Sequence, residues 1–288
     1  MAADVTIRPL EPADTAGADA LAWSALQVHV PDEMRPEEAG RAARGRARIA
    51  HVQATDPEGC WAAEEDGELV GVALSLVRED VWGLSLLAVA PGRQGRGIGG
   101  AVLAPALAYG DRRRGRIILS STDPRAMRRY FRAGLRIKPC VAAAGALNRS
   151  RLPAGLRARP GDAAQDAARI DAVSRQVRGA AHGPDIAALT AGGDALLVLG
   201  DRGFAVHRDG SPVLLAARDR DAAADLLRSC FAAAAPGASV HVDFISEGND
   251  WAVAVALDLG LSLSPDGPVF VGGETGPFAP YLPSGAYL

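Results

Sequence analysis

The segment Gln94–Gly100, with the sequence QGRGIGG, constrains the fold of this chain more than any other. It follows a run of strand character, GLSLLAVA, and leads into an apolar run of helical character, AVLAPALAYG. Glycines at such a place let the backbone adopt positive φ angles and approach a phosphate closely. The exposed N–H groups and the helix dipole then favour an anion. The segment therefore predicts a strand, a phosphate-binding loop and a helix, in this order.

The runs around this loop predict a mixed α/β fold. Those upstream predict a strand, two helices and a β-hairpin over residues 5–10, 11–26, 36–51 and 60–77. The hairpin turns at Asp66-Gly67, a strong signal for a tight turn. Downstream, a strand over 115–122 precedes a helix over 123–134, with Asp123 at its N-cap and Gly134 at its end. Antiparallel strands thus precede a β-loop-α-β-α unit.

The second half of the chain repeats the first. Asp123, Ala126, Tyr130 and Gly134-Leu135 recur as Asn249, Ala252, Ala256 and Gly260-Leu261, at a constant offset of 126 residues. A fixed spacing of this kind indicates two diverged copies of one fold. The join is expected near 143–153, where small residues, Asn, Ser and Pro cluster. We therefore expect a first copy over residues 1–146 and a second copy over 153–288.

The glycines permit a second interpretation. Gly95, Gly97 and Gly100 also spell G-x-G-x-x-G, the dinucleotide fingerprint, and Asp123 lies 23 residues beyond Gly100, near where a ribose-binding acid is wanted. However, that loop normally follows the first strand of a parallel βαβ unit, whereas an antiparallel hairpin precedes it here. Asp123 also heads a helix, where capping explains it. An NAD-dependent oxidoreductase is therefore the weaker alternative.

Two segments resemble motifs of one enzyme family. LAVAPGRQGRGIGG, from Leu87 to Gly100, resembles motif A of the GNAT acyltransferases, whose signature is Gln/Arg-x-x-Gly-x-Gly/Ala. DPRAMRRYFRAGL, from Asp123 to Leu135, is similar to the family's Asn-x-x-Ala-x-x-x-Tyr-x-x-x-Gly-Phe helix, with Asp for Asn and Leu for Phe. The resemblance covers residues 5–140 and, more weakly, 156–272. It implies an α/β protein, with an α+β mixed sheet, of two tandem GNAT-like acyl-CoA N-acyltransferase domains.

The resemblance also implies an activity and its residues. The first copy is expected to transfer the acetyl group of acetyl-CoA to a primary amine of a small-molecule or protein acceptor that the sequence does not identify. Tyr130 matches the general acid that protonates the departing thiolate, and a backbone N–H at or near Val89 would stabilise the oxyanion. The sequence identifies no general base, although Ser85 is a candidate for positioning a water. The residues expected to contact the cosubstrate are Leu87, Ala88, Val89, Gln94, Gly95, Arg96, Gly97, Ile98, Gly99, Gly100 and Asp123.

The second copy is expected to bind no acyl-CoA. The stretch from Leu87 to Leu103 has 17 residues, whereas its counterpart from Leu215 to Leu227 has 13, and Arg218–Asp221 stands in place of the glycines. Ala256 stands where Tyr130 would be. A rival from another class is an acyl-CoA-binding regulator without turnover, against which Tyr130 argues because a sensor needs no acid.

The remaining features exclude some classes of function. The net charge of −3 gives no reason to expect nucleic acid or an acidic membrane as partner. There is no signal peptide and no apolar run near the ~20 residues of a spanning helix, so a cytoplasmic protein is expected. Its three cysteines and five histidines are scattered, which predicts reduced thiols and no metal.

Three smaller features carry weaker expectations. Arg41, Arg44 and Arg48 share one helix face, which favours a solvated charged face over an anion-binding one. His29 is a candidate acceptor contact. The C-terminal run 276–288, with three aromatic residues, is expected to dock as an ordered tail.

Overall fold

A computed structural model describes residues 5–27 and 38–288, which fall into two compact units. The first unit takes the described residues of Met1–Val77, Trp82–Arg113 and Leu288. The second takes Arg78–Val81 and Arg114–Tyr287. His29 lies outside the described residues.

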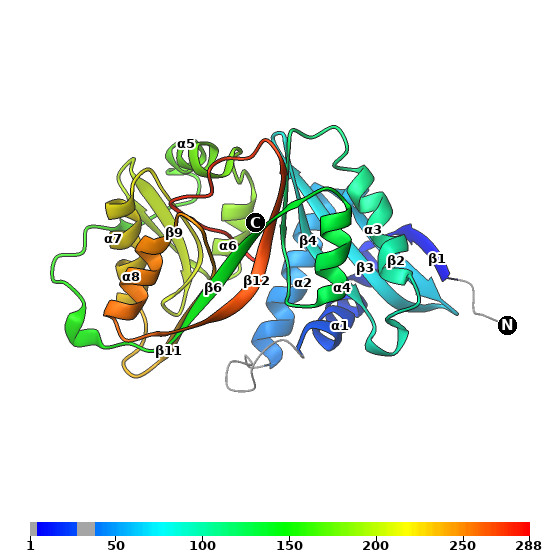
Figure 1. Ribbon diagram of the computed structural model, residues 1–288, viewed down its shortest axis with the longest axis horizontal. Coiled ribbons are helices and arrows are strands. Elements are labelled where there is room, and N and C mark those ends of the chain that lie inside the picture. Colours follow the sequence, from blue (N-terminus) through cyan, green and yellow to red (C-terminus); the bar gives the residue numbers. More distant parts are fainter. Residues whose placement is uncertain (1–4, 28–37) are drawn as a thin grey trace. The chain divides into compact units, whose positions relative to one another are not determined.

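The first unit is a twisted antiparallel sheet with three helices (Figure 1). Its strands are β1 (Val5–Pro9), β2 (Cys60–Glu65), β3 (Glu68–Arg78) and β4 (Val81–Val89), in that order across the sheet. Its helices are α1 (Thr15–Leu26), α2 (Glu38–Thr55) and α3 (Ile98–Ala108). The hairpin turn between β2 and β3 has φ angles of 53° at Asp66 and 79° at Gly67. These angles confirm the predicted tight turn.

Helix α3 packs on the sheet of the first unit through small and branched side chains. Ile98, Val102 and Ala106 of the helix meet Ala63 of β2 and Val70 and Ala73 of β3. Five of these six residues are at most 3% exposed, and none exceeds 4%. This packing fixes the N-terminus of α3 just after the end of β4, where the glycine loop joins them.

One sheet of the second unit combines strands from both copies. Its strands are β5 (Gly115–Leu119), β12 (Ser262–Gly273), β6 (Arg136–Ala146) and β11 (Ser239–Ser246), in that order. All three pairings are antiparallel, and Phe270 of β12 lies opposite Ile118 and Ile137. β12 comes from the second copy but lies between β5 and β6 of the first, as Figure 1 shows for β12 and β6. The two copies therefore share a sheet. The limits 1–146 and 153–288 describe the extent of the two copies along the sequence, and they stay a prediction.

The second sheet of this unit belongs to the second copy alone. Its strands are β13 (Tyr281–Leu282), β10 (Ser211–Ala217), β9 (Gly203–Arg208), β8 (Ala195–Leu199) and β7 (Arg159–Pro160), in that order. The helices of this unit are α4 (Pro124–Arg132), α5 (Ala167–Arg178), α6 (Asp185–Ala191), α7 (Arg220–Ala232) and α8 (Asp250–Asp258). Phe231 of α7 and Trp251 of α8 share one apolar core with β10 and β11.

Two long strands were not predicted. β6 contains Pro139 and a run of alanines, and β12 contains Pro265, Gly267 and Pro268, so neither has the alternation typical of a strand. The predicted ordered tail is confirmed, since Phe278, Tyr281 and Leu282 are at most 2% exposed. Within residues 5–27 and 38–288, no helix is long and apolar enough to cross a membrane.

Candidate active site

The end of β4 carries the residues expected to line the cosubstrate site. Ala88 is 4% exposed, whereas Leu87 and Val89 are half-buried and pack against the α3 cluster. The amide of Ala90 donates to the carbonyl of Val70 at 3.0 Å, which is the last bond holding this chain segment to β3. Beyond it the chain leaves the sheet and enters the loop.

The loop has the backbone that its glycines were expected to provide. Gly95 has φ of 82°, and Gly97, the N-cap of α3, has φ of 89° and ψ of −13°. A Cβ atom built on either glycine meets nothing within 4 Å. Glycine is therefore required by the backbone conformation and not by a lack of space. For other L-residues the left-handed region costs about 1–2 kcal/mol. Gly99 and Gly100, by contrast, lie within the first turn of α3.

The amides of this loop are available to a ligand. The amides of Gly100 and Ala101 donate to the carbonyl of Gly97, at 2.9 and 3.1 Å. Within the described part of the chain, the amides of Gly95, Gly97 and Gly99 have no hydrogen-bond acceptor. Unsatisfied N–H groups at a helix N-terminus form a site for an anion such as a pyrophosphate.

The charged side chains of the loop are already engaged. Arg96 pairs with Glu65 of β2 at 2.6 Å and Arg93 pairs with the same carboxylate at 2.5 Å. The Glu65 side chain is only 1% exposed, and the hydrogen bond from Arg96 lowers its pKa. The amide of Gln94 donates to the carbonyl of Val89 at 3.1 Å. These contacts tie the loop to β2 and β4, so the free amides rather than the arginines form the ready anion site.

Asp123 and Tyr130 lie on α4, in the second unit. The Asp123 carboxylate accepts hydrogen bonds from the Arg125 amide and guanidinium, both at 2.8 Å. It is thus the N-cap of α4, as its place before Pro124 predicted. Its contact with the cosubstrate stays a prediction.

Tyr130 is a buried side chain with a neighbour from the second copy. It is 5% exposed, and its ring meets Phe270 of β12 edge-on, with ring centroids 5.5 Å apart and planes at 74°. Burial raises the pKa of its phenol. The hydroxyl therefore stays protonated over the whole neutral range, which is the state a proton donor needs.

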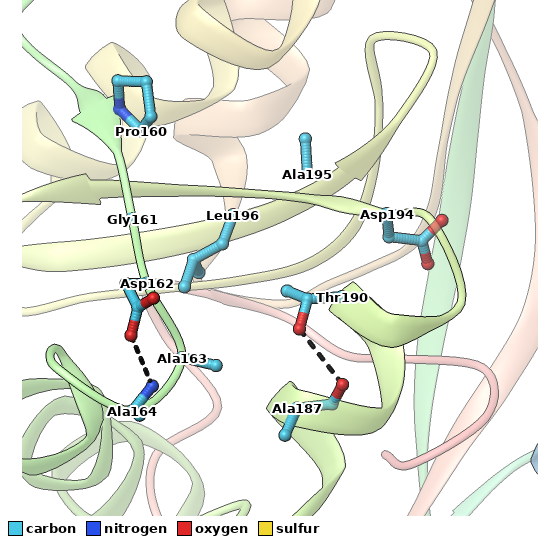
Figure 2. A pocket seen from close by; sticks show the side chains of 10 residues that line it. All are labelled: Pro160, Gly161, Asp162, Ala163, Ala164, Ala187, Thr190, Asp194, Ala195 and Leu196. Atoms are coloured by element: carbon cyan, nitrogen blue, oxygen red, sulfur yellow. Dashed lines mark hydrogen bonds between the residues drawn. The ribbon is translucent and has the colours of Figure 1, made fainter.

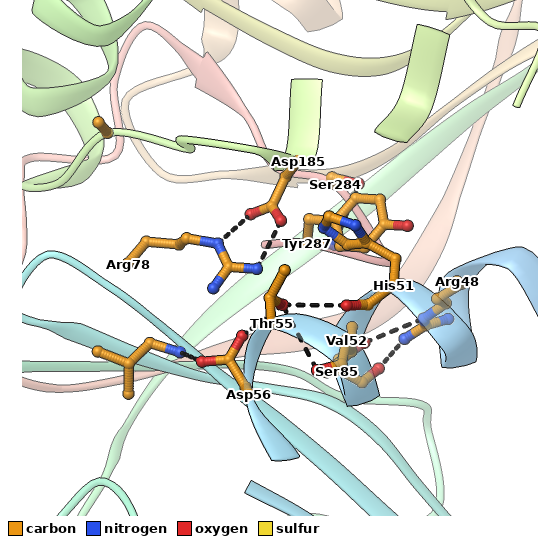
Figure 3. A network of polar contacts seen from close by, with 12 residues as sticks. Arg48, His51, Val52, Thr55, Asp56, Arg78, Ser85, Asp185, Ser284 and Tyr287 are labelled. Carbon is orange, nitrogen blue, oxygen red and sulfur yellow. Dashed lines mark hydrogen bonds and ion pairs between the residues drawn. The ribbon is translucent and has the colours of Figure 1, made fainter. Parts of the chain in front are cut away.

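Arg41 and Arg48 of α2 do not form the expected solvated face. Arg41 is bound through both its terminal nitrogens to Asp19 of α1, at 3.0 and 3.1 Å, and its side chain is 13% exposed. Arg48 donates to both the hydroxyl and the carbonyl of Ser85 on β4 (Figure 3). For these two residues the prediction was wrong, because their acceptors lie far away in the sequence. The Ser85 hydroxyl thus accepts from a guanidinium, and its role in positioning a water stays a prediction.

A second polar network of Figure 3 was not visible in the sequence. Arg78 binds Asp185 through two nitrogens, at 2.7 and 2.8 Å, and the two side chains are 6% and 0% exposed. Removing one partner of such a buried pair leaves a costly uncompensated charge. Sequence offered no signal, since 107 residues separate the two.

The pocket drawn in Figure 2 is lined by polar side chains that already bind other groups of the chain. It has a volume of about 590 Å³ and is formed by the second copy alone. Its polar side chains are committed within the chain: Asp162 accepts from the amides of Ala164 and Gln165, and Thr190 donates to the carbonyl of Ala187. Asp194 is paired with Arg208 at 2.7 Å. The volume of this pocket therefore does not identify it as the active site.

Metal and thiol chemistry find no support among the described residues. They hold no group of three or more His, Cys, Asp or Glu side chains that could bind a metal ion. Cys60, Cys140 and Cys230 are unpaired and buried. Burial raises the pKa of Cys60 to about 12 and that of Cys140 to about 11, which disfavours the nucleophilic thiolate.

The glycine loop and α4 agree with a known family. The sequence profile of the acetyltransferase (GNAT) family matches residues 21–135, from α1 to the end of α4. Residues 21–135 are therefore similar to a GNAT acetyltransferase domain. No curated protein matches the chain significantly in sequence.

Solved structures share the fold of this chain over nearly its whole length. A putative acetyltransferase from Pyrococcus horikoshii is 16% identical with a TM-score of 0.78, over 99% of this chain and 96% of that one. A GCN5-related N-acetyltransferase from Sphaerobacter thermophilus is 14% identical with a TM-score of 0.58, over 93% and 95%. A tandem GNAT protein from the clavulanic acid biosynthesis pathway is 14% identical with a TM-score of 0.55, over 94% and 98%. These likenesses confirm the predicted mixed α/β fold of two tandem GNAT-like domains.

Proposed function

We propose that the first copy is an N-acetyltransferase that moves the acetyl group of acetyl-CoA to a primary amine. The observation that carries the proposal is the loop between β4 and α3. Gly95 and Gly97 hold left-handed backbone there, and amides without an acceptor precede the helix. The profile match of residues 21–135 supports the same assignment.

The proposed binding mode uses backbone more than side chains. The amides of Gly95, Gly97 and Gly99 take the pyrophosphate, with the dipole of α3 behind them. The backbone of Leu87 to Val89 pairs with the pantetheine arm, and an N–H at or near Val89 stabilises the oxyanion. Ala88, Gln94, Arg96, Ile98 and Asp123 complete the proposed contacts. Arg96 acts by way of Glu65, which holds the loop in shape.

Tyr130 is the proposed general acid. Ordinary pKa values near 10 for a phenol and ~8.5 for a thiol make proton transfer to the thiolate uphill by ~1.5 units, or about 2 kcal/mol. Burial raises the pKa of Tyr130 further. Desolvation raises the pKa of a thiol in the same direction, so the gap between the two groups stays small when both lose water. The amine reaches the site neutral, which removes the need for a general base.

The two alternative functions, an oxidoreductase and a non-catalytic regulator, require different structural features. An oxidoreductase of the dinucleotide-binding type needs a parallel βαβ unit, whereas β2 and β3 before the loop are antiparallel. Asp123 is also occupied as a helix cap. A regulator that only binds acyl-CoA needs the loop but no acid, so turnover separates it from the enzyme.

The test is a screen of amine acceptors with acetyl-CoA, in which release of free thiol is followed. The screen covers polyamines, amino acids, aminoglycosides and peptides with free N-termini or lysines. We expect thiol release that requires an acceptor and that Tyr130→Phe lowers. Acetyl-CoA binding without any acceptor-dependent release would favour the regulator, and binding of NADH alone would favour the oxidoreductase.

A further inference from the structure

The edge of β10 in the second copy is already occupied. The segment Phe278–Leu282, here called the tail segment, runs along β10, and its strand β13 pairs antiparallel with the edge of β10. Leu282 lies opposite Leu215 and Tyr281 opposite Ala216. The amide of Ala217 also donates to the carbonyl of Pro280 at 3.2 Å.

This edge corresponds to the proposed pantetheine edge of the first copy. β10 precedes α7 as β4 precedes α3, and Leu215 corresponds to Leu87 in the alignment of the two copies. In the first copy the residues from Leu87 onward are assigned to the pantetheine arm. In the second copy the backbone of the chain's own tail segment takes that place.

Asn249 holds the tail segment from the other side. It is fully buried; its amide nitrogen donates to the carbonyl of Phe278 at 2.9 Å, and its oxygen accepts from the amide of Tyr281 at 2.9 Å. Asn249 stands 126 residues after Asp123, so the second copy retains the Asn of the GNAT helix motif where the first copy has Asp. The Asn249 side chain thus binds one carbonyl and one amide of a peptide backbone. A pantetheine arm carries amide groups of the same kind.

A carboxylate caps the N-terminus of α7, the helix that follows β10 as α3 follows β4. Asp219 caps α7 by accepting from the amide of Ala222 at 2.9 Å, and it pairs with Arg202. The N-terminus of α7 therefore faces a fixed negative charge from its own chain, where α3 offers free amides.

We propose that the tail segment occupies the β10 edge of the second copy in place of the pantetheine arm of a cofactor. The inference rests on the proposed function, which assigns the corresponding edge of β4 to the pantetheine arm. Phe278 and Tyr281 are fully buried, and their rings meet edge-on with centroids 5.3 Å apart. The Tyr281 hydroxyl lies 3.0 Å from Nε2 of His182. The tail segment thus completes the core of the second copy and excludes acyl-CoA from it.

The test turns the tail into a ligand without deleting it. A protease recognition sequence is inserted between Glu274 and Thr275, next to the exposed Gly273–Glu274 pair, and the folded chain is cut there. Peptide 275–288 should remain bound through gel filtration. S-Acetylpantetheine, which carries the arm but no nucleotide, should then speed its release in a concentration-dependent way. Adenosine 3′,5′-bisphosphate, the other half of the cosubstrate, should have no effect.

A matched pair of variants in the uncut chain gives an independent readout. Asn249→Ala removes both hydrogen bonds to the tail segment, so exchange of the Tyr281 amide should quicken roughly ten- to thirtyfold, the worth of two neutral bonds. Asp250→Ala, at the exposed neighbouring position, should leave that exchange unchanged.

Immediate loss of the peptide on cutting, or release that S-acetylpantetheine does not alter, would overturn the inference. So would exchange of the Tyr281 amide at the rate of an unfolded peptide in the wild type, or exchange that Asn249→Ala leaves unchanged. Neither readout uses turnover, so failure of the proposed acetyl transfer would be seen separately.

Discussion

Replacement of Gly97 by alanine tests the loop without adding charge or bulk. Gly97 has φ of 89°, and a Cβ there meets nothing within 4 Å, so the change adds no clash. Its cost is the left-handed backbone alone, about 1–2 kcal/mol for alanine. If the free loop relaxes, binding must restore that conformation, and the Kd for acetyl-CoA rises about 5- to 30-fold.

Gly92→Ala is the matched control within the same loop. Gly92 has no positive φ, and a Cβ there also meets nothing within 4 Å, so this variant should bind acetyl-CoA as the wild type does. Calorimetric titration gives Kd, and thermal unfolding shows whether the strain of Gly97→Ala instead lowers stability, by about 2–4 °C per kcal/mol. Wild-type Kd and wild-type melting together in Gly97→Ala, or equal effects of the two substitutions, would refute the argument.

Other predictions concern the acid and the buried ion pair. Tyr130→Phe should leave acetyl-CoA affinity nearly unchanged and lower kcat by roughly 10²–10⁴, the usual worth of a positioned acid; kcat like the wild type's would return Tyr130 to a packing role. Because burial raises the pKa of Tyr130, kcat should not fall with rising pH until above about pH 10, the ordinary value for a phenol, and a fall near pH 8 would contradict this. Asp185→Asn breaks the buried pair with Arg78 and should cost about 3–5 kcal/mol in denaturant unfolding, whereas Asp258→Asn, with its side chain 55% exposed, should cost under about 1 kcal/mol. Equal losses would show that burial does not set the cost.

Local signals in the sequence predicted the parts of the fold that depend on neighbours along the chain. The Asp66-Gly67 turn, the cap at Asp123 and the positive φ angles at Gly95 and Gly97 each follow from the demands of one residue on its own backbone. The order of strand, loop and helix followed from the same local patterns.

Pairings between distant segments could not be predicted in this way. The insertion of β12 between β5 and β6 depends on which edges are free once both copies are folded, and no local pattern encodes that choice. The same holds for Phe270, which comes from the second copy and packs on the ring of Tyr130. The occupant of the β10 edge was equally hidden, although the aromatic residues of the tail predicted that it would dock.

The partners of charged side chains were the weakest part of the site prediction. Arg41 and Arg48 lie on one helix face, which favoured solvent, yet Asp19 and Ser85 bind them. Arg96 points to Glu65, which lies 31 residues earlier. A helical spacing shows which side chains share a face, but not what that face meets.

The number of acetyl-CoA molecules bound per chain tests the central claim most directly. Calorimetric titration of the intact protein should give one site, and the double variant Gly97→Glu, Gly99→Glu should bind none while circular dichroism shows a folded chain. At acetyl-CoA one hundred times Kd, thermal unfolding of the wild type should show roughly 2.7 kcal/mol of stabilisation, and NADH should give none. Two sites per chain, binding that survives the glutamates, or stabilisation by NADH without acetyl-CoA would contradict the claim that the loop of the first copy is the acyl-CoA site.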